Sequence, residues 1–176
     1  MFSIESCKLP RGALLNSYLN SGAYTDCYRT EVPGTVTHAQ YICAFYTTLL
    51  FKLERVILAW FVSKPSTDRE VEQLAAGSSD LFAAWQVEDR IENQLLLSDF
   101  HGRTRSWLMV LPIGDDSDPA TYLYFGSAIT TIQDLETGKI TLGAGFRVLL
   151  GFHKIYSRLL LYSARSRLQT QSVGNN

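Results

Sequence analysis

The second half of the chain places several strand-like segments directly before one long amphipathic helix. From Leu81 to Ile132 apolar and polar residues alternate with a period of two, as in strands. From Phe146 to Leu168 the apolar residues instead recur at helical spacing. A run of strands followed by a helix is typical of α+β domains built on an antiparallel sheet. We therefore expect a curved antiparallel sheet closed by the terminal helix, an arrangement that often encloses an apolar cavity.

The predicted terminal helix has two chemically different sides. Its polar stripe follows helical spacing and consists of Arg147, Gly151, Lys154, Arg158 and Arg165. The opposing side is mainly apolar and consists of Phe146, Leu149, Leu150, His153, Tyr156 and Leu160. We expect the second side to pack on the sheet and the four cations of the first to be exposed. Residues 169–176 are polar, and we expect them to fray.

Four strands are predicted before this helix, over residues 81–90, 94–100, 103–111 and 120–132. Alternation places three sets of residues each on a common strand face: Ala83, Trp85 and Val87; Arg103, Arg105, Trp107 and Met109; Tyr122, Tyr124 and Gly126. Gly126 is interpreted as a bulge or bend that lets the sheet curl. The segment GDDSDP, between the last two strands, is predicted to be a solvated loop.

The first half of the chain predicts one strand and two helices. Residues 23–32 alternate loosely and predict a strand that ends at Pro33-Gly34. Thr35 or Thr37 can then cap a helix running to about Ser63. Thr67 and Glu70 form a capping box for a short helix that closes at Gly77. Residues 1–21 are expected to be irregular, and the 176 residues fit a single domain.

Composition restricts the classes of function. Hydrophobic residues make up 46% and charged residues only 19%, so some apolar surface must face a ligand, a partner or a membrane, or the core is unusually large. The net charge of −1 gives no electrostatic indication of nucleic-acid binding. The apolar stretch 41–62 contains Lys52, Glu54 and Arg55, which argues against a membrane span.

The cysteines and the N-terminus both favour a cytoplasmic protein. Cys7, Cys27 and Cys43 form no CxxC pair and are odd in number, so we expect three free thiols. The first twelve residues include Glu5 and lack a long apolar run, which makes them a poor signal peptide.

Few residues indicate chemistry. His38 is expected to be solvated, and His101 to belong to a hairpin turn. His153 is either a core histidine bonded to a carbonyl or a polar group pointing into a ligand cavity. No ligand spacing for a metal is present, and no cofactor is predicted. Three carboxylates stand in apolar surroundings and are candidates for acid–base work, although nothing places two of them together: Asp26, Glu54 and Asp89.

Four segments resemble a known bacterial family. They are AYTDCYRTEVPG, AFYTTLLFKLERVIL, FAAWQVEDRIENQLLLSDFHGRTRSWLMV and GFHKIYSRLLLYSARSRL, which together span roughly residues 22–168. In order and type they are similar to the family catalogued as domain of unknown function 2867, within the START or helix-grip superfamily. The resemblance implies an antiparallel sheet wrapped around a long C-terminal helix. It implies no activity, because the family has none assigned.

These observations lead to three hypotheses about function. The leading one is binding of a small apolar molecule, lipid-like or polyketide-like, between sheet and helix. The residues expected to reach that cavity are Trp85, Trp107, Tyr124, His153 and Tyr156. The alternatives are a cyclase- or dehydratase-type enzyme that uses His153 and a tyrosine, and a partner-binding module with a filled core. The oligomeric state is left open, a homodimer included.

Overall fold

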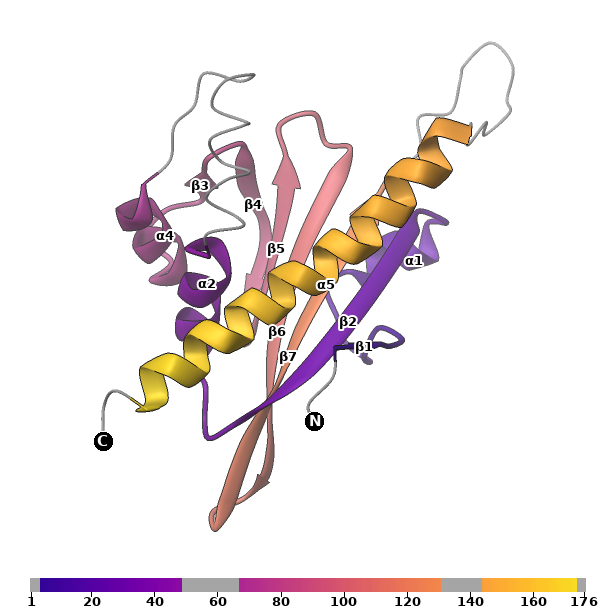
Figure 1. Ribbon diagram of the computed structural model, residues 1–176. Coiled ribbons are helices and arrows are strands. Elements are labelled where there is room, and N and C mark those ends of the chain that lie inside the picture. The colour runs from indigo at the N-terminus through magenta and orange to yellow at the C-terminus, as the bar shows by residue number, and fades with distance from the viewer. Residues whose placement is uncertain (1–3, 49–66, 131–143, 174–176) are drawn as a thin grey trace.

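The protein is an α+β fold with a seven-stranded open antiparallel sheet and a long C-terminal helix (Figure 1). The computed structural model describes residues 4–48, 67–130 and 144–173, apart from the side chains at 144–152 and 172–173. The sheet has the order β1-β2-β7-β6-β5-β4-β3. Its strands are β1 (Glu5–Ser6), β2 (Tyr24–Pro33), β3 (Leu81–Phe82), β4 (Trp85–Ile91), β5 (Gln94–Asp99), β6 (Thr104–Asp115) and β7 (Asp118–Ile129).

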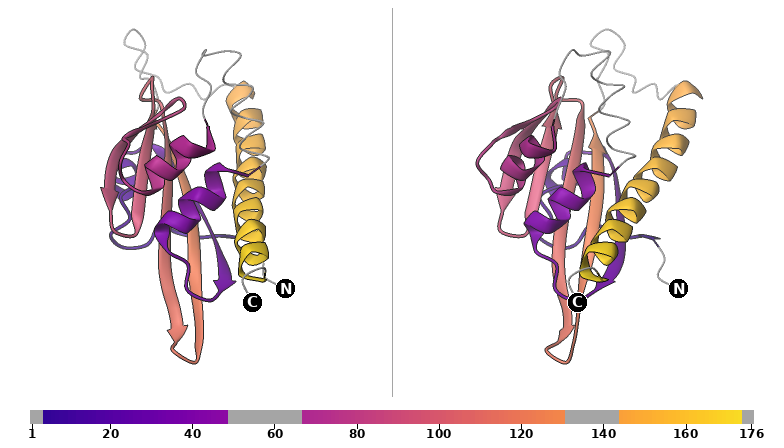
Figure 2. Two further views of the ribbon diagram at one scale, coloured as in Figure 1. Left: turned by 90° about the vertical axis from the view of Figure 1, so that its left-hand side faces the viewer. Right: turned by 60° about the vertical axis from the view of Figure 1, so that its left-hand side comes forward.

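Strands β4 to β7 form a meander, and the β6–β7 hairpin is longer than predicted. The two strands pair from Thr104–Ile129 to Asp115–Asp118, so most of the segment expected to be a loop belongs to the ladder. The side chain of Asp115 accepts hydrogen bonds from the backbone N–H groups of Ser117 and Asp118, at 2.9 and 3.1 Å. Local carboxylate capping therefore allows a tight turn, and the hairpin tip projects beyond the other strands (Figure 2).

The bulge predicted at Gly126 lies elsewhere. Pairing on both sides of Gly126 is regular, with Cys27 on β2 and Trp107 on β6 as its direct partners. The register shifts instead between Val87 and Asp89 in β4. Gly126 is required for space, because an added Cβ would lie 2.9 Å from the backbone O of Asp26 and 3.0 Å from side-chain atoms of Leu15 and Trp107.

Both faces of the sheet are covered. Helices α2 (His38–Tyr46), α4 (Asp68–Ala75) and α5 (Ala144–Val173) cover one, which we call the front face (Figure 2). The N-terminal segment with α1 (Asn16–Asn20) covers the other, the back face. Gln94 fixes this segment, because its side chain accepts from the N–H of Leu14 at 2.9 Å and donates to the carbonyl of Gly12 at 3.0 Å. Residues 5–6 and 16–20 are thus regular structure in a region expected to be irregular.

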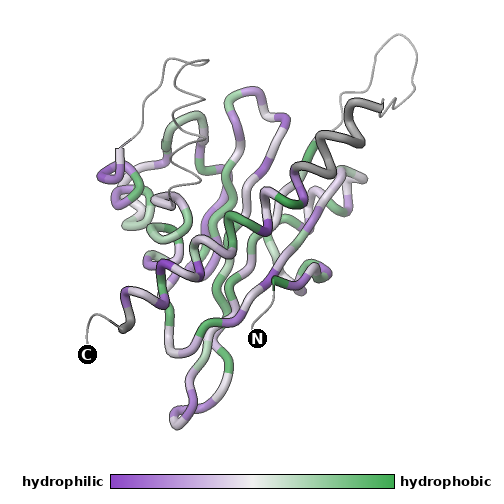
Figure 3. Tube along the Cα trace, in the orientation of Figure 1, coloured by the Kyte–Doolittle hydropathy of each residue, from purple (hydrophilic) through white to green (hydrophobic). Residues whose placement is uncertain are grey.

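Alternation along the strands separates two cores. Leu95, Leu108 and Phe125 are neighbours across β5, β6 and β7 and belong to the front core. Leu96, Trp107 and Cys27 belong to the back core. Hydrophobic residues therefore run continuously along the central strands (Figure 3).

The two short helices begin at the predicted caps. Thr37 and Gln40 form a capping box at the start of α2, and Thr67 and Glu70 form another at the start of α4. The prediction of one helix running to about Ser63 is wrong, because α2 ends at Tyr46 and a turn and a bend follow at Thr47 and Thr48. Residues 49–63 lie outside the described residues.

Helix α5 spans 30 residues and runs diagonally across the front face (Figure 1). The prediction that Lys154 and Arg158 are exposed is confirmed, and Leu160 is buried as expected. The expectations for the side chains of Phe146, Arg147, Leu149, Leu150 and Gly151 lie outside the described residues.

The prediction that Arg165 is exposed is wrong, because Arg165 is only 8% exposed. Because α5 crosses the sheet at an angle, the same side of the helix faces solvent at Lys154 and Arg158 and faces protein at Arg165, about three turns after Lys154. The C-terminal half of α5 packs against α2, and Arg167 donates to the carbonyl of Thr47 at 3.0 Å.

The outer side of α5 carries exposed apolar side chains. Ile155, Leu159 and Tyr162 are 59%, 49% and 57% exposed. Among the helices that the structure describes, none is both long and apolar enough to cross a membrane.

Candidate ligand-binding cavity

A cavity of about 180 Å³ lies between α5 and the front face of the sheet. Aromatic side chains from four elements form much of its wall: Phe45 of α2, Trp85 of β4, Phe125 of β7 and Tyr156 of α5. Thr104 and Ile129, which pair with each other, line it at one end of the β6–β7 hairpin. Its polar lining residues are Thr104, Arg105, Ser106, Ser127 and His153.

The polar wall contains a hydrogen-bonded cluster of Asp26, Ser127 and His153. Asp26 on β2 and Ser127 on β7 are direct cross-strand partners, so their side chains share the front face. The Oγ of Ser127 lies 2.6 Å from Oδ1 of Asp26 and 2.7 Å from Nε2 of His153. The same nitrogen of His153 lies 3.6 Å from Oδ2 of Asp26.

The proton positions in this cluster follow from its donors and acceptors. An ionised carboxylate only accepts hydrogen bonds, so the single hydroxyl proton of Ser127 points to Asp26. The hydroxyl oxygen then accepts from His153, which places a proton on Nε2. Asp26 also accepts the backbone N–H of Ser127 at 3.1 Å and the hydroxyl of Tyr28 at 3.5 Å.

This geometry differs from that of a serine hydrolase. In such a triad serine donates to histidine, and the carboxylate binds the other ring nitrogen. Here Asp26 takes the proton of Ser127 and contacts the same nitrogen of His153. The cluster therefore holds Ser127 as a hydrogen-bonding group and lacks the serine-to-histidine proton path of such a triad.

Two tyrosines of β2, near the buried carboxylate of Asp26, have raised pKa values. Burial, with the charge of Asp26 as a smaller cause, raises the pKa of Tyr24 to about 12. The same two causes raise the pKa of Tyr28 further. Both phenols are therefore neutral hydrogen-bond donors at ordinary pH.

Trp85 adds a donor to the apolar side of the cavity wall. Its indole Nε1–H is buried and has no hydrogen-bond partner among the described residues. Buried donors are nearly always paired, so this group is suited to a ligand acceptor. The cavity thus combines aromatic walls with one donor on Trp85 and a polar cluster at Ser127.

Three of the five residues predicted to reach the cavity line it. Trp85, His153 and Tyr156 are brought together here. Trp107 and Tyr124 lie in the back core instead, and Trp107 donates to the side chain of Gln94 at 2.9 Å. Both lie on the back face of the sheet, whereas α5 covers the front face, so the prediction that they reach the cavity is wrong.

The other candidate residues occupy different settings. Asp26 belongs to the cluster, Asp89 is exposed and caps the N–H of Arg90, and Glu54 lies outside the described residues. The prediction that His38 is solvated is wrong. It is half-buried, and burial and then the charge of Arg90 lower its pKa to about 4. Arg105 pairs with Glu88 at 2.8 Å and lies over the ring of Tyr18.

Sequence reasoning missed Ser106 and Ser127. Both are small polar residues inside apolar strands. Only the strand register shows that they lie opposite one another. Ser106 also bonds to the hydroxyl of Tyr46 at 3.2 Å. Within the described ranges, no group of three or more histidine, cysteine or acidic residues could hold a metal ion.

Comparisons with known proteins identified no relative of this chain. No family model, curated protein or solved structure matches this chain. The resemblance to the domain of unknown function 2867 family and to the START superfamily therefore stays a prediction.

Proposed function

We propose that this protein binds a small neutral apolar molecule carrying one hydroxyl group, in the cavity between α5 and the front face. The observation that carries the proposal is the cluster of Asp26, Ser127 and His153 at the edge of an otherwise aromatic cavity. We also propose a helix-grip architecture, which is supported by the antiparallel sheet and the C-terminal helix lying across it.

The size of the cavity limits the ligand. An apolar cavity of about 150 Å³ accommodates one benzene molecule, and the cavity here measures about 180 Å³. A single substituted ring fits this space, whereas a long acyl chain does not. The lipid-like or polyketide-like ligand expected from the sequence is thereby narrowed to a monocyclic molecule or a fragment of that size.

The charge of the cluster selects the polar group. Asp26 places a carboxylate 3.6 Å from the ring nitrogen of His153, so it would repel a ligand carboxylate at this end. The one guanidinium among the described lining residues, that of Arg105, is already paired with Glu88 at 2.8 Å. A hydroxyl group can donate to the free lone pair of Ser127 and accept from the indole of Trp85, both of which line the cavity. A phenol or alcohol therefore fits the cavity better than an acid.

The experiment is calorimetric titration with toluene, 4-methylphenol and 4-methylbenzoate. A ring that buries roughly 200 Å² gains about 5 kcal/mol, which corresponds to a Kd on the order of 0.1–1 mM before association costs. We expect 4-methylphenol to bind about fivefold more tightly than toluene, because one hydrogen bond contributes about 1 kcal/mol. The benzoate should bind most weakly.

Two variants separate the cavity from its polar anchor. Thr104→Phe fills one end of the cavity at a partly exposed position and should weaken all three ligands. Ser127→Ala removes the anchor and should abolish the preference for the phenol while toluene still binds. If none of the three compounds binds the folded wild-type protein, or if Thr104→Phe leaves their binding unchanged, the proposal fails.

The enzymatic alternative uses the same cavity. His153 and Tyr156 both line it, which is the arrangement that a cyclase- or dehydratase-type reaction would need. A product formed from a bound ring compound in wild type and lost in His153→Gln, with binding retained, would favour this alternative.

A further inference from the structure

Two of the three cysteines form a contact pair on the outer strands of the sheet. Pairing of β1 with β2 continues one residue past Ser6, since the N–H of Cys7 donates to the carbonyl of Cys27 at 2.9 Å. Cys7 and Cys27 thus occupy directly opposed positions, and their Sγ atoms lie 3.3 Å apart. Opposed residues in antiparallel strands have Cα atoms about 4.5–5.5 Å apart. This range is compatible with a disulfide without movement of the backbone.

The two thiols differ in access and in acidity. Cys27 is 3% exposed in the back core, whereas Cys7 is half-buried and lines a surface hollow. The hydrogen bond with the Cys27 thiol lowers the pKa of Cys7 below its ordinary value, aided by the charge of Arg29 and opposed by burial and by Glu5. The same contact and burial raise the pKa of Cys27. Cys7 is therefore the nucleophile of the pair, and Cys27 is positioned to resolve it.

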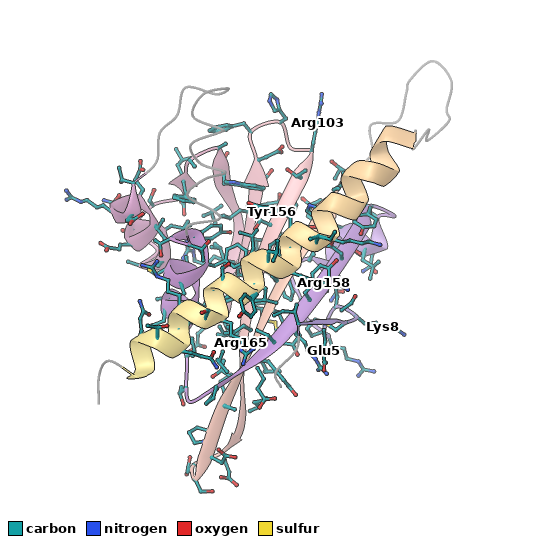
Figure 4. The ribbon with its side chains drawn as sticks, in the orientation of Figure 1. Glu5, Lys8, Arg103, Tyr156, Arg158 and Arg165 are labelled. Atoms are coloured by element: carbon teal, nitrogen blue, oxygen red, sulfur yellow. The ribbon has the colours of Figure 1, made fainter. Side chains whose placement is uncertain are left out.

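The hollow beside Cys7 is open and cationic. It measures about 620 Å³ and lies between the N-terminal segment, β2 and α5. Lys8, Lys154 and Arg158 line it, and the one carboxylate in its wall, Asp26, has a side chain only 8% exposed. In Figure 4, Lys8 and Arg158 lie on either side of the region where β1 meets β2. Glu5, the exposed carboxylate nearest to Cys7 in the chain, is paired with Arg29 at 3.2 Å, so an anionic molecule approaching Cys7 is attracted by the three cations of the hollow.

We propose that Cys7 and Cys27 are a thiol oxidation site that reacts with an anionic low-molecular-weight disulfide of the glutathione type. In the first step the Cys7 thiolate attacks one sulfur of that disulfide. A mixed disulfide forms and one thiolate leaves. Cys27, after losing its proton to solvent, attacks the Sγ of Cys7 and displaces the second thiolate. Two protein thiols are oxidised to one disulfide, and one small disulfide is reduced to two thiols.

The site has a consequence for the back face of the sheet. The two cysteines are separated by 20 positions, and the residues between them include α1 and the segment held by Gln94. A disulfide would link the two ends of this N-terminal segment at the edge of the sheet. It would also lower the conformational entropy of the unfolded chain. We expect a higher melting temperature for the oxidised protein than for the reduced protein.

The test is incubation of the reduced protein with oxidised glutathione, followed by denaturation, thiol alkylation and peptide mass mapping. We expect a Cys7–Cys27 linked peptide and an alkylated Cys43. The Cys43→Ser variant is the matched control and should react at the wild-type rate. In Cys27→Ser the mixed disulfide on Cys7 should accumulate, and in Cys7→Ser the reaction should slow by at least about tenfold because Cys27 is buried.

The preference for an anionic oxidant is tested by comparison with 2-hydroxyethyl disulfide, which is neutral. The rate with oxidised glutathione should fall as salt rises, and the rate with the neutral disulfide should not. Lys8→Gln combined with Lys154→Gln and Arg158→Gln should remove the difference between the two compounds. Oxidation of Cys43 in place of the pair, or disulfides formed only between molecules, would overturn the site. Equal salt dependence for both compounds would overturn the anionic oxidant.

Discussion

Acidification from pH 7.5 to pH 5 should destabilise the fold through His38. This residue begins α2, and its Nε2 is buried without a hydrogen-bond partner in the part of the chain that the structure describes. Burial and the guanidinium of Arg90 lower its pKa from 6.5 to about 4, although a hydrogen bond with the Leu108 backbone opposes them. The unfolded chain therefore binds a proton between these two values that the folded chain does not.

The sign and size of the effect follow from proton linkage. Above pH 6.5 the histidine is neutral in both states, and stability is unaffected by its titration. Stability is lost as pH falls from 6.5 to about 4. At pH 5 the loss from this residue is about 2 kcal/mol, since one pKa unit corresponds to about 1.4 kcal/mol.

Urea unfolding at pH 7.5 and pH 5 measures this loss. The His38→Gln variant should lose about 2 kcal/mol less than wild type between the two pH values. His101→Gln, at an exposed hairpin tip, is the matched control and should behave like wild type. Equal losses in wild type and His38→Gln would refute the reasoning, because the pH dependence would then come from other groups.

Three further predictions concern stability and can be measured by urea or thermal unfolding. Leu161→Ala should cost about 3 kcal/mol because Leu161 is fully buried, whereas Leu159→Ala, 49% exposed on the same helix, should cost under about 0.5 kcal/mol; similar costs would contradict the orientation of α5. Gly126→Ala should lower the free energy of unfolding by about 1–3 kcal/mol, because the added methyl group crowds Leu15 and Trp107. An unchanged stability would contradict this tight packing. Thr67→Ala should cost about 1 kcal/mol by removing the cap of α4, a loss that Thr67→Ser should largely avoid.

Local rules predicted the elements well because the responsible interactions are short-range. Thr37 and Thr67 cap their helices through residues three positions away, and Pro33-Gly34 ends β2 where expected. The amphipathic helix at the C-terminus is present and extends beyond both predicted ends. These features depend on hydrogen bonds and dihedral preferences within a few residues.

The face of the sheet that α5 covers could not be predicted from alternation alone. Leu95, Leu96 and Leu97 are all buried, because the helices cover one face and the N-terminal segment covers the other. Alternation grouped Trp107 with Met109 and Tyr124 with Tyr122 but gave no reason to prefer either face of the sheet. The N-terminal cover depends on the side chain of Gln94, whose partners lie about eighty positions away.

The candidate sites depend on register and are invisible in the linear sequence. Asp26 and Ser127 are 101 positions apart and meet only because β2 pairs with β7. Cys7 meets Cys27 through a strand of two residues, too short to show a period. The expectation of three free thiols is confirmed, but their contact required the structure.

The position of bound 4-methylphenol decides whether the cavity under α5 is a binding site. Intermolecular nuclear Overhauser effects between the ligand methyl or ring protons and the protein report this position. We predict contacts with Trp85, His153 and Tyr156 and none with Trp107, which lies on the other side of the sheet. Contacts with Leu159 and Tyr162 on the outer side of α5, or with no residue of the cavity, would contradict the proposed site.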